Sequence, residues 1–266
     1  MLQAMNQRAG ARQRVSIMGI EIDRITHEAA VARIRNALAE GRGGWVVTPN
    51  LDILRQLRSV PAHRELVSDA DLVLADGMPL VWASRLQGTP LPERVAGSDL
   101  VWSIPEVAAE LGVRLFLLGG EDGASEAAAS ILNERFPGLS IAGTLSPPRG
   151  FEQDEARVKE IVSAVARTDP RLVLVGLGFP KQEYLIRELR DACPQAWFLG
   201  VGIGISFLGG HVQRAPRWMQ AVGLEWLHRF AQEPQRLAQR YFVHGLPFAA
   251  RLLTSAALER SRKVRT

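Results

Sequence analysis

The sequence has almost no cysteine and no long apolar run. Cys193 is the only cysteine among 266 residues, which excludes an intramolecular disulfide and fits a reducing compartment. No stretch reaches the roughly 18–20 apolar residues that a membrane-spanning helix needs. The N-terminal residues 1–14 also lack the apolar segment of a secretory signal peptide. We therefore expect a cytoplasmic protein, and the composition leaves a peripheral contact with a membrane open.

Several common catalytic motifs are absent as well. No G-x-G-x-x-G follows the first predicted strand, which weakens the case for a nicotinamide dehydrogenase, and no G-x-x-x-x-G-K-[ST] indicates a P-loop. Ser206 does not lie in a G-x-S-x-G elbow, the usual position of a hydrolase nucleophile. The five histidines are scattered without the spacing of metal ligands, and we predict no cofactor.

One acidic pair resembles a metal-binding motif. Asp69-Ala-Asp71 has the D-x-D pattern of many nucleotide-sugar enzymes. It precedes its predicted strand, however, whereas ligands of an open α/β sheet collect beyond the carboxyl ends of the strands. We expect these two carboxylates at the opposite edge of the sheet and predict no metal site.

What the sequence does contain is an alternation of short apolar runs with helical segments. This order predicts a Rossmann-like α/β fold, with a parallel-sheet core, helices on both faces and a helical C-terminal appendage. Residues 1–13 are expected to be a disordered lead, residues 14–210 the core and residues 211–266 the appendage. We expect the core to fold alone, because its sheet is complete before residue 211. The predicted strands lie in residues 15–23, 44–50, 70–77, 113–120, 139–145, 171–178 and 196–204.

Positive charge is concentrated in the predicted appendage. Residues 211–266 hold ten Lys and Arg against three acidic residues, a net charge of +7. The whole chain is +4, so residues 1–210 have a net charge of −3. A local excess of this kind indicates an anionic partner at that end, such as a diphosphate, lipid headgroups or nucleic acid.

The appendage also interleaves its arginines with aromatic residues. Arg236 and Arg240 are four residues apart and share one face of a helix, which Pro234 can begin at its first position. Guanidinium groups suit the several oxygens of a phosphate. The alternative interpretation is a solvated basic face with aromatic core residues behind it.

Polar residues and glycines cluster where the predicted strands end. Thr48 and Asn50, Asp76, the pair Gly119-Gly120, and Gly178 with Gln182 all follow apolar strands. Each cluster also has a structural explanation, because Asn50 and Asp99 are good helix caps and the glycines permit sharp turns. Since the carboxyl ends of parallel strands meet at one edge of a sheet, we expect a shared ligand site there. The strand-end glycines would let backbone N–H groups approach a phosphate.

Six segments together resemble one family. TPNLDIL, LADGMPLVWASRL, RVAGSDL, FLLGGEDGASEAAA, VGLGFPKQEYLI and RAPRWMQAVGLEWLHRFAQEPQRLAQRY occur in order over residues 15–242 and look like the WecG/TagA/CpsF glycosyltransferases. The resemblance implies an inverting, metal-independent enzyme. It would move a sugar from a UDP-sugar to a polyprenol-diphosphate-linked sugar at the cytoplasmic membrane surface, in the synthesis of a cell-surface polysaccharide. The family's helical appendage is implicated in membrane contact.

The resemblance also implies roles for individual residues. Asp76 matches the general base, Thr48 and Asn50 line the active site, and Gln182 helps to hold the substrate. Arg94, Gly97 and Asp99 match part of the donor pocket. The diphosphate-binding arginines of the appendage correspond to Arg229, Arg236 and either Arg240 or the position of Gln239.

Two other classes of function stay open from the residues alone. A non-catalytic α/β protein could bind acidic lipid or nucleic acid through its basic tail, because arginine and aromatic residues also suit RNA. A soluble NAD-dependent sugar-nucleotide enzyme is the other. We predict an enzyme that does not bind nucleic acid; a homo-oligomer is left open, as are the sugar and the acceptor.

Overall fold

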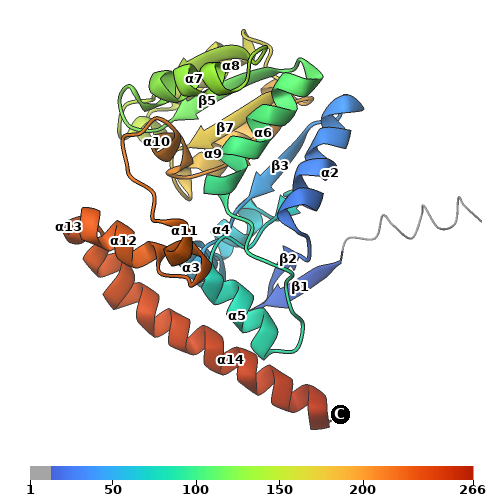
Figure 1. Ribbon diagram of the computed structural model, residues 1–266, viewed down its shortest axis with the longest axis vertical. Coiled ribbons are helices and arrows are strands. Elements are labelled where there is room, and N and C mark those ends of the chain that lie inside the picture. Colours follow the sequence, from blue (N-terminus) through green and yellow to red (C-terminus); the bar gives the residue numbers. More distant parts are fainter. Residues whose placement is uncertain (1–12, 266) are drawn as a thin grey trace, which may run out of the picture.

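The computed structural model describes residues 13–265 and contains one six-stranded parallel sheet (Figure 1). The strand order is β4-β3-β8-β7-β5-β6, and every pairing is parallel. This confirms the predicted α/β class. The predicted disordered lead lies, except for Gln13, outside the described residues. The strands are β3 (Gly44–Val47), β4 (Leu72–Val73), β5 (Arg114–Gly119), β6 (Ser140–Leu145), β7 (Leu172–Gly176) and β8 (Trp197–Gly200).

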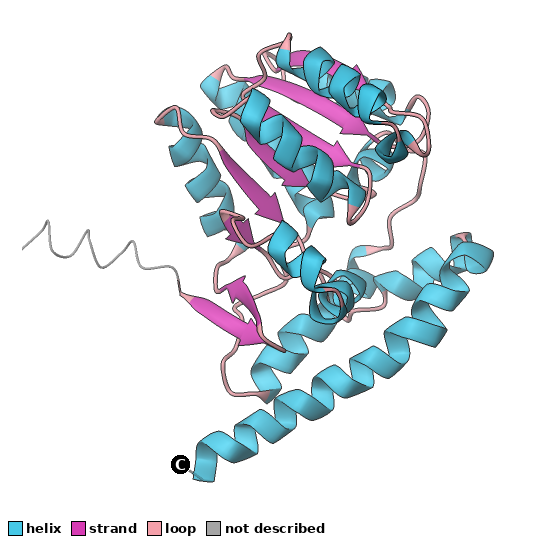
Figure 2. Ribbon diagram, turned by 180° about the vertical axis from the view of Figure 1, so that it is seen from behind, coloured by secondary structure: helices cyan, strands magenta, loops and turns pink. Residues whose placement is uncertain are grey.

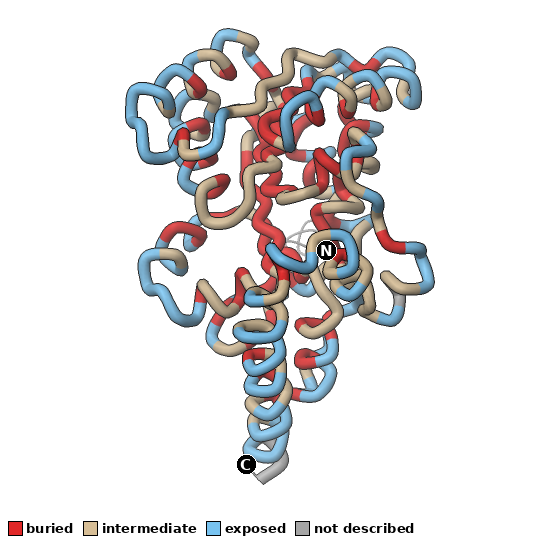
Figure 3. Tube along the Cα trace, turned by 90° about the vertical axis from the view of Figure 1, so that its left-hand side faces the viewer, coloured by how far each residue is buried: buried red, intermediate tan, exposed pale blue. Residues whose placement is uncertain are grey.

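Helices bury both faces of the sheet, and the strands are therefore apolar along their length. Alternate residues of β5 belong to different cores, with Leu115 and Leu117 on one side and Phe116 and Leu118 on the other. Buried residues accordingly fill the centre of the molecule (Figure 3). One face is covered by α2 (His27–Ala39), α6 (Gly97–Leu111), α7 (Ala124–Arg135) and α10 (Gly204–Leu208), and the other by α3 (Leu51–Ser59), α4 (Pro61–Leu66), α8 (Glu155–Ala166) and α9 (Lys181–Ala192).

The strand predicted over residues 15–23 is instead a hairpin outside the main sheet. β1 (Arg14–Ile17) pairs antiparallel with β2 (Ile20–Asp23). The turn residues Met18 and Gly19 both have positive φ, 51° and 80°, as two-residue hairpin turns of the type that matches strand twist require. The prediction was wrong because an apolar run that continues through the turn gave no sign of the reversal.

The last predicted strand also ends early. β8 stops at Gly200, four residues before the predicted end at residue 204, and Gly204 is instead the first residue of α10. Glycines at positions 200, 202 and 204 let the chain leave the sheet and begin a helix within four residues, which periodicity alone did not reveal.

The C-terminal residues form a series of helices below the sheet, as Figures 1 and 2 show. Pro234 begins α13 at its first turn, as predicted. From there the chain continues in helical conformation to Arg265, and no helix among the described residues combines the length and apolar composition needed to cross a membrane. The elements are α11 (Arg217–Ala221), α12 (Glu225–Gln232), α13 (Pro234–Ala238), the π-helical η2 (Gln239–Gly245) and α14 (Leu246–Arg265).

Helix α14 is part of the protein's core as well as of the appendage. It lies along α5 (Met78–Leu86), and Phe248, Leu252 and Ala256 are buried in the same cluster as Leu80. Removing residues 211–266 would expose that apolar surface. The prediction that residues 14–210 fold alone did not include this contact, which the completed sheet does not replace. Point substitutions are therefore the better test of the appendage.

Candidate active site

Backbone hydrogen bonds join the loops that follow the first two strands of the sheet. The N–H of Asp76 donates to the carbonyl of Pro49 at 2.9 Å, and the N–H of Val95 donates to that of Ala75 at 2.9 Å. These bonds hold the segments of residues 48–50, 75–77 and 94–97 against one another. Parallel pairing of β3 with β4 places the first two at the same sheet edge, as predicted.

Asp76 lies where these segments meet, and its environment favours the neutral acid. Its Oδ2 accepts a 3.4 Å hydrogen bond from the N–H of Gly97, the first residue of α6. Burial raises the pKa of Asp76 to about 7; Arg94 opposes this shift, Glu225 and Asp99 add to it, and the Gly97 N–H lowers it. A carboxyl group that titrates near neutrality can take up a proton at physiological pH.

Two arginines and three carboxylates form what we call the charge network: Asp76, Arg94, Asp99, Arg214 and Glu225. Arg94 is 2.9 Å from Asp99, 3.4 Å from Glu225 and 3.9 Å from Asp76, measured between guanidinium nitrogens and carboxylate oxygens. Arg214 lies 2.7 Å from Asp99 and 3.3 Å from Glu225. Its Nη1 also donates to the backbone carbonyl of Ser98 at 3.0 Å. Core and appendage therefore share one set of ion pairs next to Asp76.

Arg214 and Glu225 were not predicted as site residues. Arg214 was counted among the basic residues of the appendage, but nothing in its spacing identifies a partner in the core. Arg94 and Glu225 are separated by 131 positions, so no local pattern connects them. The RAP segment of the resemblance, which contains Arg214, is the one signal that could have singled it out.

Thr48 and Asn50 both reach the site edge, and both already make structural hydrogen bonds. Thr48 is buried, and its hydroxyl donates to the carbonyl of Gly200 at 2.9 Å. Gly97 fits closely here, since a Cβ at that position would come within 3.2 Å of Thr48 Oγ1. Asn50 is the N-cap of α3, where its Oδ1 accepts from the N–H groups of Asp52 and Ile53 at 3.1 Å. The structure places both residues beside Asp76 without testing their proposed catalytic role.

Gln182 is connected to the same edge through the end of β8. Its Oε1 accepts from the N–H of Gly178 at 3.1 Å, and its Nε2 donates to Oε1 of Glu183 at 2.8 Å. A Cβ at Gly200 would come within 2.7 Å of Gln182 Nε2, so only glycine leaves room for this amide. The Gly200 carbonyl also accepts the Thr48 hydrogen bond, so Thr48 and Gln182 both contact Gly200.

Glu183 is a buried carboxyl group that was not predicted. Its side chain has 0% exposure, and its Oε2 is buried without a hydrogen-bond partner among residues 13–265. Burial raises the pKa of Glu183 from an ordinary 4.5 to about 8, opposed by the hydrogen bond from Gln182. At neutral pH the group is therefore protonated, which avoids the cost of an isolated buried charge.

We expect Glu183 to make the protein less stable as the pH rises. Between pH 4.5 and about 8 the unfolded chain releases the Glu183 proton while the folded protein keeps it, so stability falls across this window. Glu183→Gln keeps the acceptor for Gln182 and cannot titrate. Thermal melting at pH 5 and at pH 8 should show a smaller loss for the variant. A loss equal to that of the unmodified protein would contradict the assignment.

The three strand-end glycines lie farther from Asp76. Gly119 and Gly120 follow β5, which is four strands from β4, a lateral separation of about 19 Å at the usual strand spacing. A Cβ at Gly119 would come within 2.7 Å of the Gly176 carbonyl, which explains this glycine by close packing of neighbouring strand ends. Gly178 has φ +80° in the turn before α9. These residues share the edge with Asp76, and no contact joins them to it.

The three predicted arginines of the appendage are each paired with a carboxylate. Arg229 is buried at 8% exposure, pairs with Glu233 at 3.1 Å and stacks over Phe207. Arg236 pairs with the same Glu233 at 2.6 Å. Arg240 lies 3.3 Å from Asp52, in the first turn of the helix that Asn50 caps. Arg240 is therefore the predicted appendage residue that contacts the core beside the site.

The D-x-D pair lies at the opposite edge of the sheet, as predicted. Asp71 accepts a 2.9 Å hydrogen bond from the N–H of Trp45, at the amino end of β3. Asp69 forms a 2.5 Å ion pair with Arg190 on α9. Both carboxylates thus have protein partners away from Asp76.

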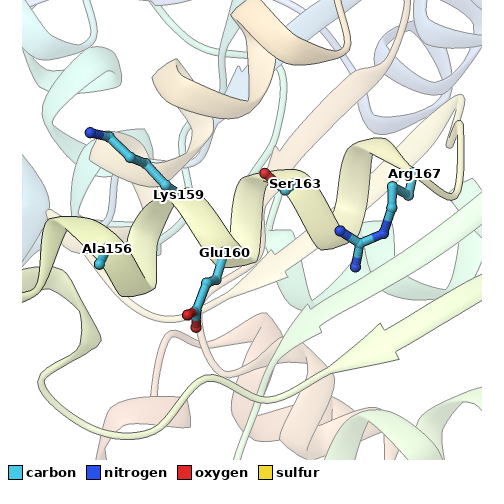
Figure 4. A pocket seen from close by; sticks show the side chains of 5 residues that line it. All are labelled: Ala156, Lys159, Glu160, Ser163 and Arg167. Atoms are coloured by element: carbon cyan, nitrogen blue, oxygen red, sulfur yellow. The ribbon is translucent and has the colours of Figure 1, made fainter.

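A surface hollow of about 450 Å³ on α8 is unrelated to these groups. Four of its five lining residues, including Lys159 and Glu160, come from that helix, and the fifth, Arg167, directly follows it. Figure 4 shows Lys159 and Glu160 pointing in different directions. No strand end contributes to the hollow, so we do not assign it to the active site.

Two curated relatives and one family profile match most of the chain. The chain is 33% identical over 199 residues to an N-acetylglucosaminyldiphosphoundecaprenol N-acetyl-beta-D-mannosaminyltransferase of Bacillus spizizenii, covering 75% of each chain. A protein of the same name from Staphylococcus aureus is 29% identical over 230 residues, covering 85% of this chain and 87% of its own. The glycosyl transferase WecG/TagA/CpsF family profile matches residues 15–263. The chain therefore belongs to the WecG/TagA/CpsF family and is a glycosyltransferase.

Proposed function

We propose that this protein is an inverting glycosyltransferase that moves a sugar from a UDP-sugar to a sugar linked to polyprenol diphosphate. The observation that carries the proposal is Asp76, a carboxyl group with a pKa of about 7 at the carboxyl ends of the strands, beside Arg94. The names of the relatives supply the class of acceptor, an N-acetylglucosaminyl-diphospho-lipid, and the N-acetylmannosaminyl group as the first donor sugar to test.

The reaction is a single displacement at the anomeric carbon. The acceptor hydroxyl oxygen bonds to that carbon as the bond to the donor's phosphate oxygen breaks, and UDP leaves with the electron pair. Asp76 takes the hydroxyl proton. General base assistance of this kind contributes about 10²- to 10⁴-fold to the rate.

The leaving diphosphate needs positive charge or N–H donors. The charge network does not supply net positive charge, because two arginines face three carboxylates when Asp76 is ionised. The N-terminus of α6 offers its positive end, because the N-cap residue Ala96 makes no side-chain hydrogen bond; the Gly97 N–H at that end is already bonded to Asp76. Further charge comes from Arg229, Arg236 and Arg240, whose ion-pair partners within residues 13–265 are Glu233 and Asp52. We assign these arginines to the diphosphate of donor or acceptor.

We expect the reaction to need no divalent metal. The D-x-D carboxylates are paired with Arg190 and the Trp45 backbone at the far edge of the sheet. Transfer should therefore continue at an unchanged rate in EDTA, measured as UDP release. If EDTA stops the reaction and Mg²⁺ or Mn²⁺ restores it, the assignment is wrong.

The appendage is proposed to face the cytoplasmic membrane surface, where the lipid-linked acceptor resides. It carries a net charge of +7, and it exposes large apolar side chains, including Trp218 and Val222. Interfacial segments gain from both features. We retain residues 14–210 and 211–266 as the core and the appendage.

The decisive assay measures UDP release from a panel of UDP-sugars with a short-chain diphosphate-linked N-acetylglucosamine as acceptor. One UDP-sugar should release UDP only when the acceptor is present. If the sugar of that donor is α-linked to UDP, an inverting enzyme should give a β-linked product. Binding of UDP-sugars and lipid without UDP release from any donor would contradict the proposed reaction.

A further inference from the structure

A second cavity lies between the core and the C-terminal helices, away from the charge network. It has a volume of about 430 Å³ and lies between α3 and the helical run through η2 and α14. We call it the basic pocket. Its lining residues are Met18, Arg55, Arg58, Ser59, Val243, His244, Pro247, Phe248 and Arg251.

The pocket brings together basic groups from two distant segments. Arg55 and Arg58 are three residues apart on α3, while His244 and Arg251 lie two turns apart on the facing helix. Arg55 is held by Asp52 at 2.9 Å. Arg58 and Arg251 are exposed, and neither has an ion-pair partner within the described part of the chain. No acidic residue of the described chain lines the pocket, so an anion can be held by the guanidinium groups of Arg58 and Arg251.

One wall of the pocket is apolar and continues to the protein surface. Two of the pocket's apolar lining residues differ in exposure: Phe248 is buried, and Val243 is 60% exposed. Phe242 and Leu246, one residue before and three residues after Val243 in the sequence, are 45% and 51% exposed. A ligand that fits both features has an anionic head and an apolar tail.

The pocket shares no residue with the charge network or with Gln182. Along α3, Arg58 is eight residues from the Asn50 cap, which corresponds to about 12 Å of helix rise. An anion held by Arg58 and Arg251 would therefore lie away from Asp76, while Asp52 connects Arg55 of the pocket with Arg240 of the proposed diphosphate site.

We propose that the basic pocket binds the phosphate headgroup of an anionic membrane lipid. The guanidinium groups of Arg58 and Arg251 hold the phosphate oxygens, and the acyl chains leave along Val243 toward the exposed apolar residues. Bound lipid would fix α3 and the C-terminal helices at the membrane surface and so orient the active site toward its acceptor. The choice of a lipid, rather than free phosphate, rests on the proposed membrane location.

The test measures binding of dihexanoyl phosphatidylglycerol, below its micelle-forming concentration, to the full chain by calorimetry. A monomeric lipid, unlike an anionic membrane, has no surface potential that attracts basic residues anywhere on the protein. Only residues that contact the lipid should therefore affect its affinity. Arg58→Gln with Arg251→Gln should weaken binding by about tenfold or more, because two charge-assisted contacts are lost. The charge-matched control, Arg64→Gln with Arg260→Gln, changes two exposed arginines outside the pocket and should change affinity less than about twofold.

Each outcome bears on the proposal. Equal weakening by both double variants, or no lipid binding by the unmodified chain, would overturn the pocket. Inorganic phosphate that binds as tightly as the lipid would overturn the lipid assignment. Turnover on a water-soluble acceptor should be unchanged in the pocket variant, and loss of turnover would place these arginines in catalysis instead. Lipid binding with the expected pattern but no sugar transfer would refute only the proposed function.

Discussion

Asp76→Asn should lower turnover by about two or more orders of magnitude and leave UDP-sugar binding nearly unchanged. The amide has the shape of the carboxyl group and can still accept the Gly97 hydrogen bond. What it cannot do is take a proton from the acceptor hydroxyl, so the loss falls on the transition state rather than on the ground state. Single-turnover rates and equilibrium binding of the UDP-sugar separate these two quantities.

The pH dependence gives the same prediction a second readout. Because Asp76 has a pKa of about 7 and must be ionised to act as a base, kcat/KM should rise through pH 7 and level off above it. This limb should disappear in Asp76→Asn. Asp122→Asn, the same change at an exposed site after β5, is the matched control and should keep both rate and pH profile. Full turnover in the Asp76 variant would remove this residue from the mechanism.

Arg94→Gln and Glu225→Gln should shift the pH profile in opposite directions. The Arg94 guanidinium lowers the pKa of Asp76 and the Glu225 carboxylate raises it. Without Arg94 the rising limb of kcat/KM should move above pH 7, and without the Glu225 charge it should move below pH 7. A purely structural effect of either substitution would lower the rate without moving the two limbs apart.

Arg94→Gln should also destabilise the protein. The substitution leaves Asp99 and Glu225 sharing only Arg214, and removing one member of this partly buried ion-pair set costs about 1–2 kcal/mol. Chemical denaturation measures this loss. Arg114→Gln, at the exposed start of β5, should cost less than about 0.5 kcal/mol. Equal losses for both variants would mean that the charge network does not join the core to the appendage.

The position of the site followed from local sequence to a large extent. Near-continuous apolar runs such as LVLVG at residues 172–176 are what a strand buried on both faces requires, so they indicated a parallel sheet covered by helices. Once the strands are parallel, the residues that follow them must meet at one edge. That is why Thr48 and Asp76 could be placed together, and Asp69 and Asp71 at the other edge.

Local sequence was less informative where the backbone reverses or bends. The turn at Met18 and Gly19 interrupts an apolar run without a typical Asn-Gly or Asp-Gly signal, so local sequence predicts one strand where the chain forms a hairpin. Likewise, whether a glycine at a strand end serves a ligand or packing depends on its neighbours. Gly119 is explained by the Gly176 carbonyl, and Gly200 by the side chain of Gln182.

Hydrophobic periodicity and charge are properties of neighbouring residues, so the order of residues was enough to predict the sheet, the polar edge and the basic appendage. The groups that surround Asp76 could be identified only in the folded chain. Glu225 lies 131 positions from Arg94, yet the two are 3.4 Å apart, and burial of such charges sets the pKa on which the chemistry depends. Burial and ion pairing between distant segments arise only when the chain is packed, since they depend on distances in space rather than on order along the chain.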